Sequence, residues 1–195
     1  MKIIVTGALG HIGSHLVRRL PDFFPYCEVL MIDNLLTQRY SSLFNLPKKA
    51  KYKFIEADVI NIDLTKYFKD ADVVIQLAAI TDAAASFENA SEVEKVNFEA
   101  TKAVANACIE AHCPMIMASS TSVYGTQKNK VDEYCEPNEL KPQSPYAETK
   151  LKEEDMISKK VLEEGLKAVK FRYGTIFGVS RGMRFHTAVN KFCWQ

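Results

Sequence analysis

The sequence lacks a long apolar run, an excess of either charge and any closely paired cysteines. Its 195 residues contain 25 Lys and Arg against 24 Asp and Glu, so no charge excess favours a nucleic-acid partner. No run approaches the ~18 apolar residues that cross a bilayer, which argues against a membrane partner. The first strand-like residues precede no small-residue cleavage site, so we interpret them as a strand and not as a signal peptide.

The cysteines number five and form no Cys-x-x-Cys pair, a pattern that favours a reduced, cytoplasmic protein. Cys108, His112 and Cys113 lie close in sequence. An apolar helix face and a helix end explain them better than a metal does. We therefore expect a cytoplasmic protein that holds no metal.

Short apolar runs alternate with stretches of helical periodicity, and hydrophobic residues make up 47% of the chain. The runs that we expect to be strands are Lys2 to Val5, Val29 to Ile32, Lys53 to Glu56, Val73 to Leu77, Met115 to Ala118 and Ala168 to Phe171. Helices are expected between them, over 11–20, 89–112 and 145–164. The runs lack polar alternation, as expected for strands covered on both faces. The pattern predicts an α/β fold with a doubly wound parallel sheet.

The stretch 89–112 carries one apolar stripe at helical spacing. The stripe consists of Val93, Val96, Ala100, Val104, Ala107 and Ala111. Core packing against the sheet is the simplest explanation of this stripe. Its small residues also leave room for a partner helix, so the helices over 89–112 and 145–164 allow a homodimer.

A glycine-rich segment follows the first expected strand and opens a helix; it is Thr6-Gly7-Ala8-Leu9-Gly10-His11-Ile12-Gly13. Gly7 permits a tight turn, Gly10 lets backbone amides approach a pyrophosphate, and Gly13 lets the helix lie close to the strand. The N–H groups and the dipole of a helix N-terminus favour such an anion. A glycine turn without a ligand is the alternative. The strand before the segment and the helix after it favour a dinucleotide.

Asp33 ends the second expected strand, about 20 residues beyond the last glycine of the motif. A carboxylate there accepts hydrogen bonds from both ribose hydroxyls. It also repels a 2′-phosphate by roughly 4 kcal/mol at ~4 Å and an effective dielectric of about 20. The expected cofactor is therefore NAD rather than NADP. Arg39 lies close in sequence and would soften this choice, but an exposed position on a loop is the simpler expectation for it.

Further motifs follow in order: Asp58-Val59, Leu77-Ala78-Ala79, Asn97, Ser119–Gly125, Tyr146–Lys150 and Arg172–Gly178. From Lys2 to about Arg184 the sequence resembles the extended short-chain dehydrogenase/reductase family, and within it the NAD-dependent epimerases and dehydratases such as UDP-glucose 4-epimerase. The resemblance implies a Rossmann fold. Its NAD-binding domain would span residues 1–178, and 179–195 would begin a smaller substrate-binding domain, most of which is absent. We accordingly expect the chain to be a fragment of a longer protein.

The resemblance implies cofactor contacts from most of these segments. The implied residues are Gly7, Leu9, Gly10, His11, Ile12, Gly13, Asp33, Asn34, Asp58, Val59, Leu77, Ala78, Ala79, Asn97, Tyr146, Lys150 and Tyr173. Asp58 and Val59 would contact the adenine, and 77–79 would line the groove beside the nicotinamide ribose. Asn97 would orient the active-site loop through its amide. A turn-forming role for Asp58 and a structural hydrogen-bonding role for Asn97 are the alternatives.

Tyr146 and Lys150 form a Tyr-x-x-x-Lys motif, and residues four apart share one face of a helix. A free phenol ionises at pH ~10. A neighbouring ammonium and an oxidised nicotinamide both favour the phenolate, which can then act as a base. In the family pattern the catalytic Ser or Thr lies three residues before the Val of Val-Tyr-Gly, which is Ser120 here. The neighbouring hydroxyls of Ser119 and Thr121 are the alternatives.

Thr121 and Ser122 follow Ser120 at positions where the family's dehydratases and decarboxylases carry acidic residues. An elimination needs an acid and a base near the sugar, so we expect an epimerase. It would oxidise a nucleotide sugar to a keto-sugar and return the hydride to the other face, with NAD retained. One alternative is an NAD(P)-dependent sugar-nucleotide or ketone reductase. The other is a truncated NAD-binding module without catalytic activity.

Overall fold

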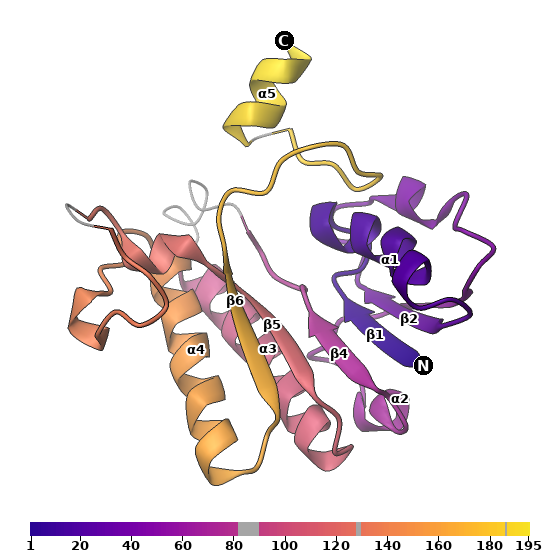
Figure 1. Ribbon diagram of the computed structural model, residues 1–195, viewed down its shortest axis with the longest axis horizontal. Helices are drawn as coiled ribbons and strands as arrows, with labels where there is room; N and C mark the ends of the chain where they lie inside the picture. Colours follow the sequence, from indigo (N-terminus) through magenta and orange to yellow (C-terminus); the bar gives the residue numbers. More distant parts are fainter. Residues whose placement is uncertain (82–89, 128–129, 186) are drawn as a thin grey trace.

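One six-stranded parallel sheet organises the protein, whose computed structural model describes residues 1–81, 90–127, 130–185 and 187–195 (Figure 1). The strands are β1 (Lys2–Thr6), β2 (Glu28–Asp33), β3 (Lys51–Glu56), β4 (Val73–Gln76), β5 (Met115–Ser120) and β6 (Ala168–Tyr173). They pair in the order β3-β2-β1-β4-β5-β6. The chain thus builds one half of the sheet outward from β1, then crosses back to β4. This order confirms the doubly wound Rossmann fold.

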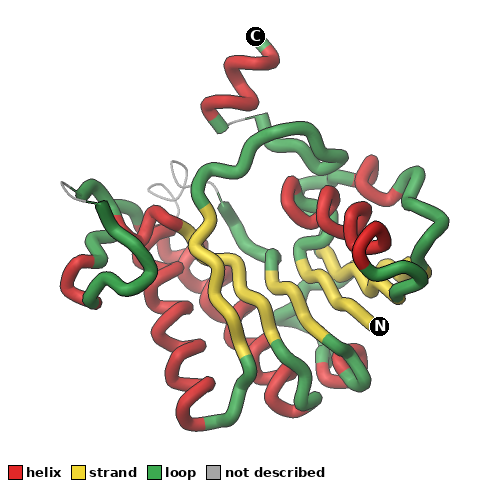
Figure 2. The backbone as a smooth tube through the Cα atoms, viewed as in Figure 1, coloured by secondary structure: helices red, strands yellow, loops and turns green. Residues whose placement is uncertain are grey.

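Helices occupy the connections between strands, as Figure 2 shows in red. They are α1 (His11–Phe23), α2 (Thr65–Phe68), α3 (Ala90–Glu110), α4 (Pro145–Glu163) and the C-terminal α5 (Ala188–Trp194), with short 3-10 helices η1 (Tyr40–Leu43), η3 (Thr121–Tyr124) and η4 (Pro137–Glu139). The start of α4 follows the sequence directly: the Ser144 hydroxyl caps the helix by accepting from the Ala147 N–H, and Pro145 takes the first helical position.

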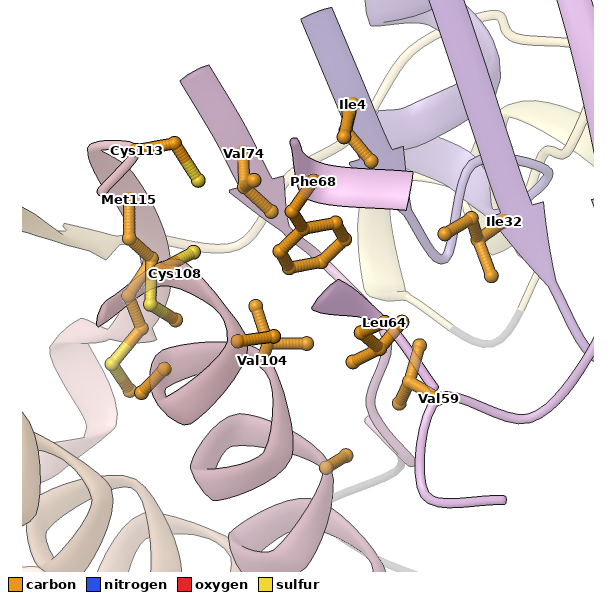
Figure 3. Packing of buried hydrophobic residues seen from close by; sticks show 14 of the residues in the cluster. Ile4, Ile32, Val59, Leu64, Phe68, Val74, Val104, Cys108, Cys113 and Met115 are labelled. Atoms are coloured by element: carbon orange, nitrogen blue, oxygen red, sulfur yellow. The ribbon is translucent and has the colours of Figure 1, made fainter. Parts of the chain in front are cut away.

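Alternating residues of β1 pack on opposite faces of the sheet. Ile3 and Val5 pack in a cluster with Val17 and Leu20 of α1. Ile4 belongs to the other cluster, which α2, α3 and α4 cover (Figure 3). The predicted stripe of α3 lies in that second cluster through its buried members Ala100, Val104 and Ala107. Core packing of the stripe is therefore confirmed, while the side chain of Val93 lies outside the described residues.

The expectation that every strand is covered on both faces is wrong for the two edge strands. Lys51, Lys53 and Glu56 of β3 are exposed. In β6, Val169 is 53% exposed and Phe171 is 45% exposed. An edge strand has a neighbour on one side only, so the helices that cover the central strands do not reach its whole surface.

Two expected absences concern only the part of the chain described above. Within it, no helix has both the length and the apolar character that a membrane span requires. The same residues bring no three potential metal ligands together.

Phe68 offers a test of the core beneath α2 and α3. Its ring is fully buried between β1, β4 and α3, close to Ile4, Val74 and Val104 (Figure 3). Phe68→Ala removes the ring and leaves a cavity, so we expect the free energy of unfolding to fall by about 3–5 kcal/mol. Urea unfolding measures this change. Phe23→Ala, at a side chain that is 71% exposed, is the control and should cost less than about 1 kcal/mol; equal losses would contradict the packing described.

Candidate functional site

The glycine-rich loop lies where the strand order reverses, at the carboxyl ends of β1 and β4. Gly7 has a φ of +62°, and a Cβ on it would lie 2.6 Å from the Ala78 backbone nitrogen. A Cβ on Gly13 would lie 2.5 Å from the Gly7 carbonyl oxygen. These approaches exclude side chains, as the motif requires. None of the described side chains caps α1 at Gly10, so its first-turn amides are available to an anion.

Asp33 joins the end of β2 to this loop. One carboxylate oxygen accepts from the Leu9 N–H at 3.0 Å, and the other accepts from the Leu35 N–H at 2.9 Å. A carboxylate has about four acceptor positions, so the half-buried Asp33 retains capacity for further donors. The position fits the predicted contact with ribose hydroxyls.

Asn34 and Asp58 meet beside Asp33 across two strand ends. The Asn34 side-chain amide donates to Asp58 at 3.1 Å, and Asp58 also accepts from the Ile60 N–H at 3.0 Å. The turn-forming role of Asp58 is therefore present. Val59 is 5% exposed and packs in the core cluster that also contains Ile4. The predicted adenine contacts of this pair stay predictions.

The expectation that Arg39 is exposed on a loop is wrong. This residue is half-buried, and its guanidinium lies 3.8 Å from where a Cβ on Gly10 would stand. Burial lowers the pKa of Arg39, while the negative charge of Asp33 raises it. A cation thus stands near the carboxylate that is expected to select the cofactor, so it weakens the repulsion of a 2′-phosphate.

The segment after β4 is held by two buried polar side chains. The Thr6 hydroxyl accepts from the Leu77 and Ala78 N–H groups at 3.3 and 3.4 Å and also bonds the Gln76 side chain. Asn97 of α3 accepts from the Ile80 N–H at 2.7 Å and donates to the Ile80 carbonyl at 2.8 Å. The amide of Asn97 therefore orients this segment through its backbone, and half-buried Leu77, Ala78 and Ala79 line its path. These two bonds agree both with an amide that orients the active-site loop and with a structural hydrogen-bonding role for Asn97.

Tyr146 and Lys150 share one face of α4, as the motif predicts. The Lys150 ammonium lies 5.9 Å from the centroid of the Tyr146 ring. Lys150 is 4% exposed, whereas Tyr146 is half-buried. A cation and a phenol therefore stand together at the N-terminal end of α4, which packs against β5 and η3.

Glu153 completes this cluster, and the sequence analysis missed it. Its Oε2 accepts from the Lys150 ammonium at 3.0 Å and from the Thr101 hydroxyl of α3 at 2.7 Å. A signal was available in the sequence: positions 146, 150, 153 and 157 fall on one helix face, so an acidic residue there is buried with the lysine.

Ser119 and Ser120 of β5 point to opposite faces of the sheet, because side chains alternate along a strand. Ser119 is 4% exposed and donates to Glu154 on the helix side of the sheet. Ser120 points the other way, and its hydroxyl oxygen accepts from the Ser122 N–H at 3.2 Å and from the Ser122 hydroxyl at 2.8 Å. Ser119 is thus engaged by a carboxylate, and Thr121 is exposed. The catalytic role of Ser120 stays a prediction.

Arg172 of β6 braces this end of the sheet. Its guanidinium bonds Glu154 at 2.7 Å and lies 4.8 Å from the Tyr124 ring centroid. These bonds raise the pKa of Arg172 further above its already high value. Tyr124 thus interacts with this guanidinium through its ring. Tyr173 stacks on Phe171, with ring centroids 5.9 Å apart. The predicted cofactor contact of Tyr173 stays a prediction.

A strap, which we define as residues 178–184, crosses above the carboxyl ends of the strands and reaches the glycine-rich loop (Figure 1). The Gly182 N–H donates to the Ser14 hydroxyl at 2.8 Å. A Cβ on Gly182 would lie 2.1 Å from the Leu9 carbonyl oxygen. No sequence motif indicated this contact between residues so distant in the chain. The start of the region that we assigned to a second domain thus packs against the first.

His11 and Asn190 bind the two ends of the strap, Gly178 and Arg184. The Asn190 side chain accepts from the Gly178 N–H at 2.9 Å and donates to the Arg184 carbonyl at 2.7 Å. The His11 ring accepts from the Arg184 N–H at 3.4 Å and bonds the Gly178 backbone. The Arg184 guanidinium also reaches Thr81. The strap therefore joins the glycine-rich loop to the segment that follows β4.

Comparison with known proteins identifies a matching family and several relatives of this chain. A family model described as NAD dependent epimerase/dehydratase family matches residues 3–193. An uncharacterised UDP-glucose epimerase of Bacillus subtilis is 31% identical over 204 residues, which cover 100% of this chain and 63% of that protein. Human dTDP-D-glucose 4,6-dehydratase is 30% identical over 154 residues, covering 76% of this chain and 43% of that protein.

Solved structures of two epimerases are also similar to this chain. The UDP-glucuronic acid 4-epimerase of Bacillus cereus, in complex with UDP-glucuronic acid and NAD, superposes with a TM-score of 0.86 at 31% identity. The alignment covers 97% of this chain and 61% of that one. A UDP-N-acetylglucosamine 4-epimerase of Methanobrevibacter ruminantium gives a TM-score of 0.83 at 31% identity, with 96% and 58% covered. The chain thus spans less than two thirds of the length of these relatives.

Gly182 tests the contact between the strap and the glycine-rich loop. Gly182→Ala places a methyl group against the Leu9 carbonyl, so we expect the strap to separate from the loop. Hydrogen exchange followed by mass spectrometry should then show loss of amide protection over 178–184. Gly174→Ala is the control, because no described atom lies within 4 Å of its added Cβ. Unchanged protection in Gly182→Ala would contradict the contact.

His11 predicts that the strap loosens in acid. Burial lowers the pKa of His11 below 6.5; a hydrogen bond to Gly178 opposes this, and the charges of Arg184, Arg39 and His15 add to it. The neutral ring is favoured while the strap is attached, so attachment is strongest above pH 6.5 and weakens as the pH falls below it. Amide protection of 178–184, corrected for intrinsic exchange, should fall accordingly. His11→Gln should abolish this dependence, whereas exposed His15→Gln should retain it.

Proposed function

The chain belongs to the NAD-dependent epimerase/dehydratase family, whose model matches residues 3–193, and from this premise we propose that it binds NAD and epimerises a nucleotide sugar. The dinucleotide would lie across the carboxyl ends of β1 and β4. The close packing of the glycine-rich loop supports this position. Side chains at Gly7 and Gly13 would occupy the space in which the loop, the backbone after β4 and the start of α1 approach one another. NAD in the Bacillus cereus relative is consistent with the same cofactor here.

The single observation that carries the proposed chemistry is the cluster of Tyr146 and Lys150 on one face of α4. Tyr146 would remove the proton of a sugar hydroxyl, and Ser120 would hold the same oxygen by a hydrogen bond. Lys150 would bind the nicotinamide ribose and favour the phenolate of its neighbour. Bound NAD supplies a hydride acceptor that becomes the donor for the return step. Asp33 would hold the adenosine ribose, as its free acceptor capacity allows.

Epimerisation is favoured over dehydration by the residues next to Ser120. Thr121 and Ser122 carry hydroxyls that do not ionise near neutral pH, and Ser122 is engaged with Ser120. An elimination needs an acid and a base placed at the sugar. These two positions provide neither, although the family includes dehydratases.

A second candidate is an NAD-binding module without turnover. The observation in its favour is that the chain spans 58–61% of the two solved relatives described above. The two candidates differ in whether a nucleotide sugar is converted. A homodimer through α3 and α4 also stays a proposal, and sedimentation measurements would test it.

Tyr146→Phe tests the base. We expect the variant to bind NAD as the unaltered chain does, while conversion of UDP-glucose, UDP-glucuronic acid or UDP-N-acetylglucosamine falls at least ~100-fold, because proton transfer is lost. Product analysis by chromatography and calorimetric titration with NAD measure the two effects. Tyr134→Phe, at a side chain that is 84% exposed, is the matched control. Undiminished conversion in Tyr146→Phe would refute the assignment.

The same incubations separate the candidate functions. Epimerisation changes the sugar without net change in the cofactor, whereas a reductase consumes NADH in proportion to product. A chain that binds NAD and leaves every sugar nucleotide unchanged is the binding module.

A further inference from the structure

Glu153 is a fully buried carboxylate whose hydrogen bonds are incompletely satisfied. Its relative exposure is 0%. Both of its bonds, from Lys150 and Thr101, go to Oε2. The other oxygen, Oε1, has no hydrogen-bond partner in the described part of the chain. A carboxylate in this state is expensive to bury, so its presence calls for a reason other than packing.

Stability alone does not supply that reason. A buried ion pair is often matched or exceeded in stability by apolar side chains of similar volume. An apolar side chain is buried one turn farther along α4, at Ile157. A charged pair retained beside a candidate site is therefore a candidate for a functional role.

The geometry directs that role toward Lys150. A lysine side chain is a flexible stem that carries a compact charge, and here the charge is fixed from two sides. Glu153 bonds the ammonium at 3.0 Å, and the Tyr146 ring centroid lies 5.9 Å from it. The Thr101 hydroxyl in turn fixes the carboxylate from α3 at 2.7 Å. Fixing a flexible group before a ligand arrives lowers the entropy lost on binding.

Glu153 also maintains the charge of the ammonium. Burial by itself lowers the pKa of Lys150. The negative charge of Glu153, then Tyr146, the hydrogen bond that the ammonium donates to Glu153 and finally Glu154 raise this pKa, and the net change is a rise. The groups that face the ammonium are therefore Tyr146 and Glu153, with Glu154 farther along α4. Without Glu153 the ammonium would be a buried cation that has lost its hydrogen-bonded acceptor.

The adjacent Glu154 makes a useful contrast. Both of its oxygens are engaged, by Arg172 at 2.7–3.2 Å and by the Ser119 hydroxyl. It holds β5, β6 and α4 together and leaves no bond directed at Lys150. The two neighbouring carboxylates thus divide between bracing the sheet and holding the lysine.

We propose that Glu153 is a positioning residue that holds the ammonium of Lys150 in place for the nicotinamide ribose of a bound dinucleotide. The inference rests on the proposed binding of NAD and on the proposed role of Lys150. It adds a third member to the Tyr146–Lys150 cluster, one that acts through the lysine and does not itself contact the reacting atoms.

A double-mutant cycle on NAD affinity tests the inference without requiring turnover. The proteins are the unaltered chain, Glu153→Gln, Lys150→Met and the double variant, titrated with NAD by calorimetry. We expect Glu153→Gln to weaken binding about 10-fold, as loss of a supporting side chain behind a ligand-binding group does. In the Lys150→Met background the same substitution should change affinity less than about twofold, because the group that it positions is absent. Asp155→Asn removes the same charge from an exposed site on α4 and should leave affinity unchanged.

Two further measurements distinguish positioning from a general structural role. Thr101→Val keeps the carboxylate of Glu153 and removes the hydrogen bond that it accepts from Thr101. NAD affinity should therefore fall about fivefold when Lys150 is present, and it should not change in the Lys150→Met background. In Glu153→Gln the unpaired ammonium loses its proton more readily. NAD affinity should therefore decline as the pH rises above neutrality, whereas that of the unaltered chain should decline only at higher pH. Circular dichroism establishes that each variant is folded, and Thr101→Val carries the test if Glu153→Gln is not.

The outcomes separate the inference from the function on which it rests. If the unaltered chain binds no NAD, the proposed function and this inference fall together. If it binds NAD and Lys150→Met weakens binding, but the effects of Glu153→Gln and Lys150→Met simply add, then Glu153 is structural and the proposed function stands. Coupled effects with the shifted pH dependence support the positioning role.

Discussion

Close contact between backbones at the glycine-rich loop is the constraint on which the rest of the structure depends. Gly7 lies against the backbone that follows β4, and Gly13 lies against Gly7. These contacts bring α1, the end of β1 and the backbone after β4 close together. Gly182 repeats the device from the far end of the chain, against the carbonyls of Leu9 and Gly10. The segments approach this closely because Gly7, Gly13 and Gly182 have no side chain at these contacts.

Around this point, buried and half-buried polar side chains form hydrogen bonds to the backbone. Thr6 and Asn97 bind the segment after β4, Asp33 binds the loop after β1, and Asn190 closes the strap. Loops carry backbone groups that no sheet or helix satisfies, so each must find a partner when it is buried. Binding residues on loops are positioned well only when such bonds fix the loops to rigid elements. The loops of the candidate site are thus held in place by side-chain hydrogen bonds to their backbone.

The sequence predicted those features that local pattern determines. The strand–glycine–helix arrangement, the helix over Ala90–Glu110 and the shared face of Tyr146 and Lys150 all follow from spacing within a few residues. It did not predict that β3 and β6 are edge strands with exposed side chains, since strand order is a property of the whole chain. Lys51 and Lys53 nevertheless alternate with apolar residues, which is the pattern of a strand exposed on one side. The strap contacts of Gly182 and His11 join residues about 170 positions apart, and no local pattern encodes such pairs.

The position of Arg39 shows how such long-range placement changes a chemical conclusion. From sequence alone, Asp33 argues for NAD through its repulsion of a 2′-phosphate, which is roughly 4 kcal/mol at ~4 Å and an effective dielectric of about 20. A cation at a similar distance contributes attraction of the same order and opposite sign. In the folded protein Arg39 is half-buried beside Gly10 and interacts with the charge of Asp33. The net selectivity therefore depends on the difference between two comparable terms. We expect the balance to favour NAD, because hydrogen bonds from the Leu9 and Leu35 N–H groups fix the Asp33 carboxylate.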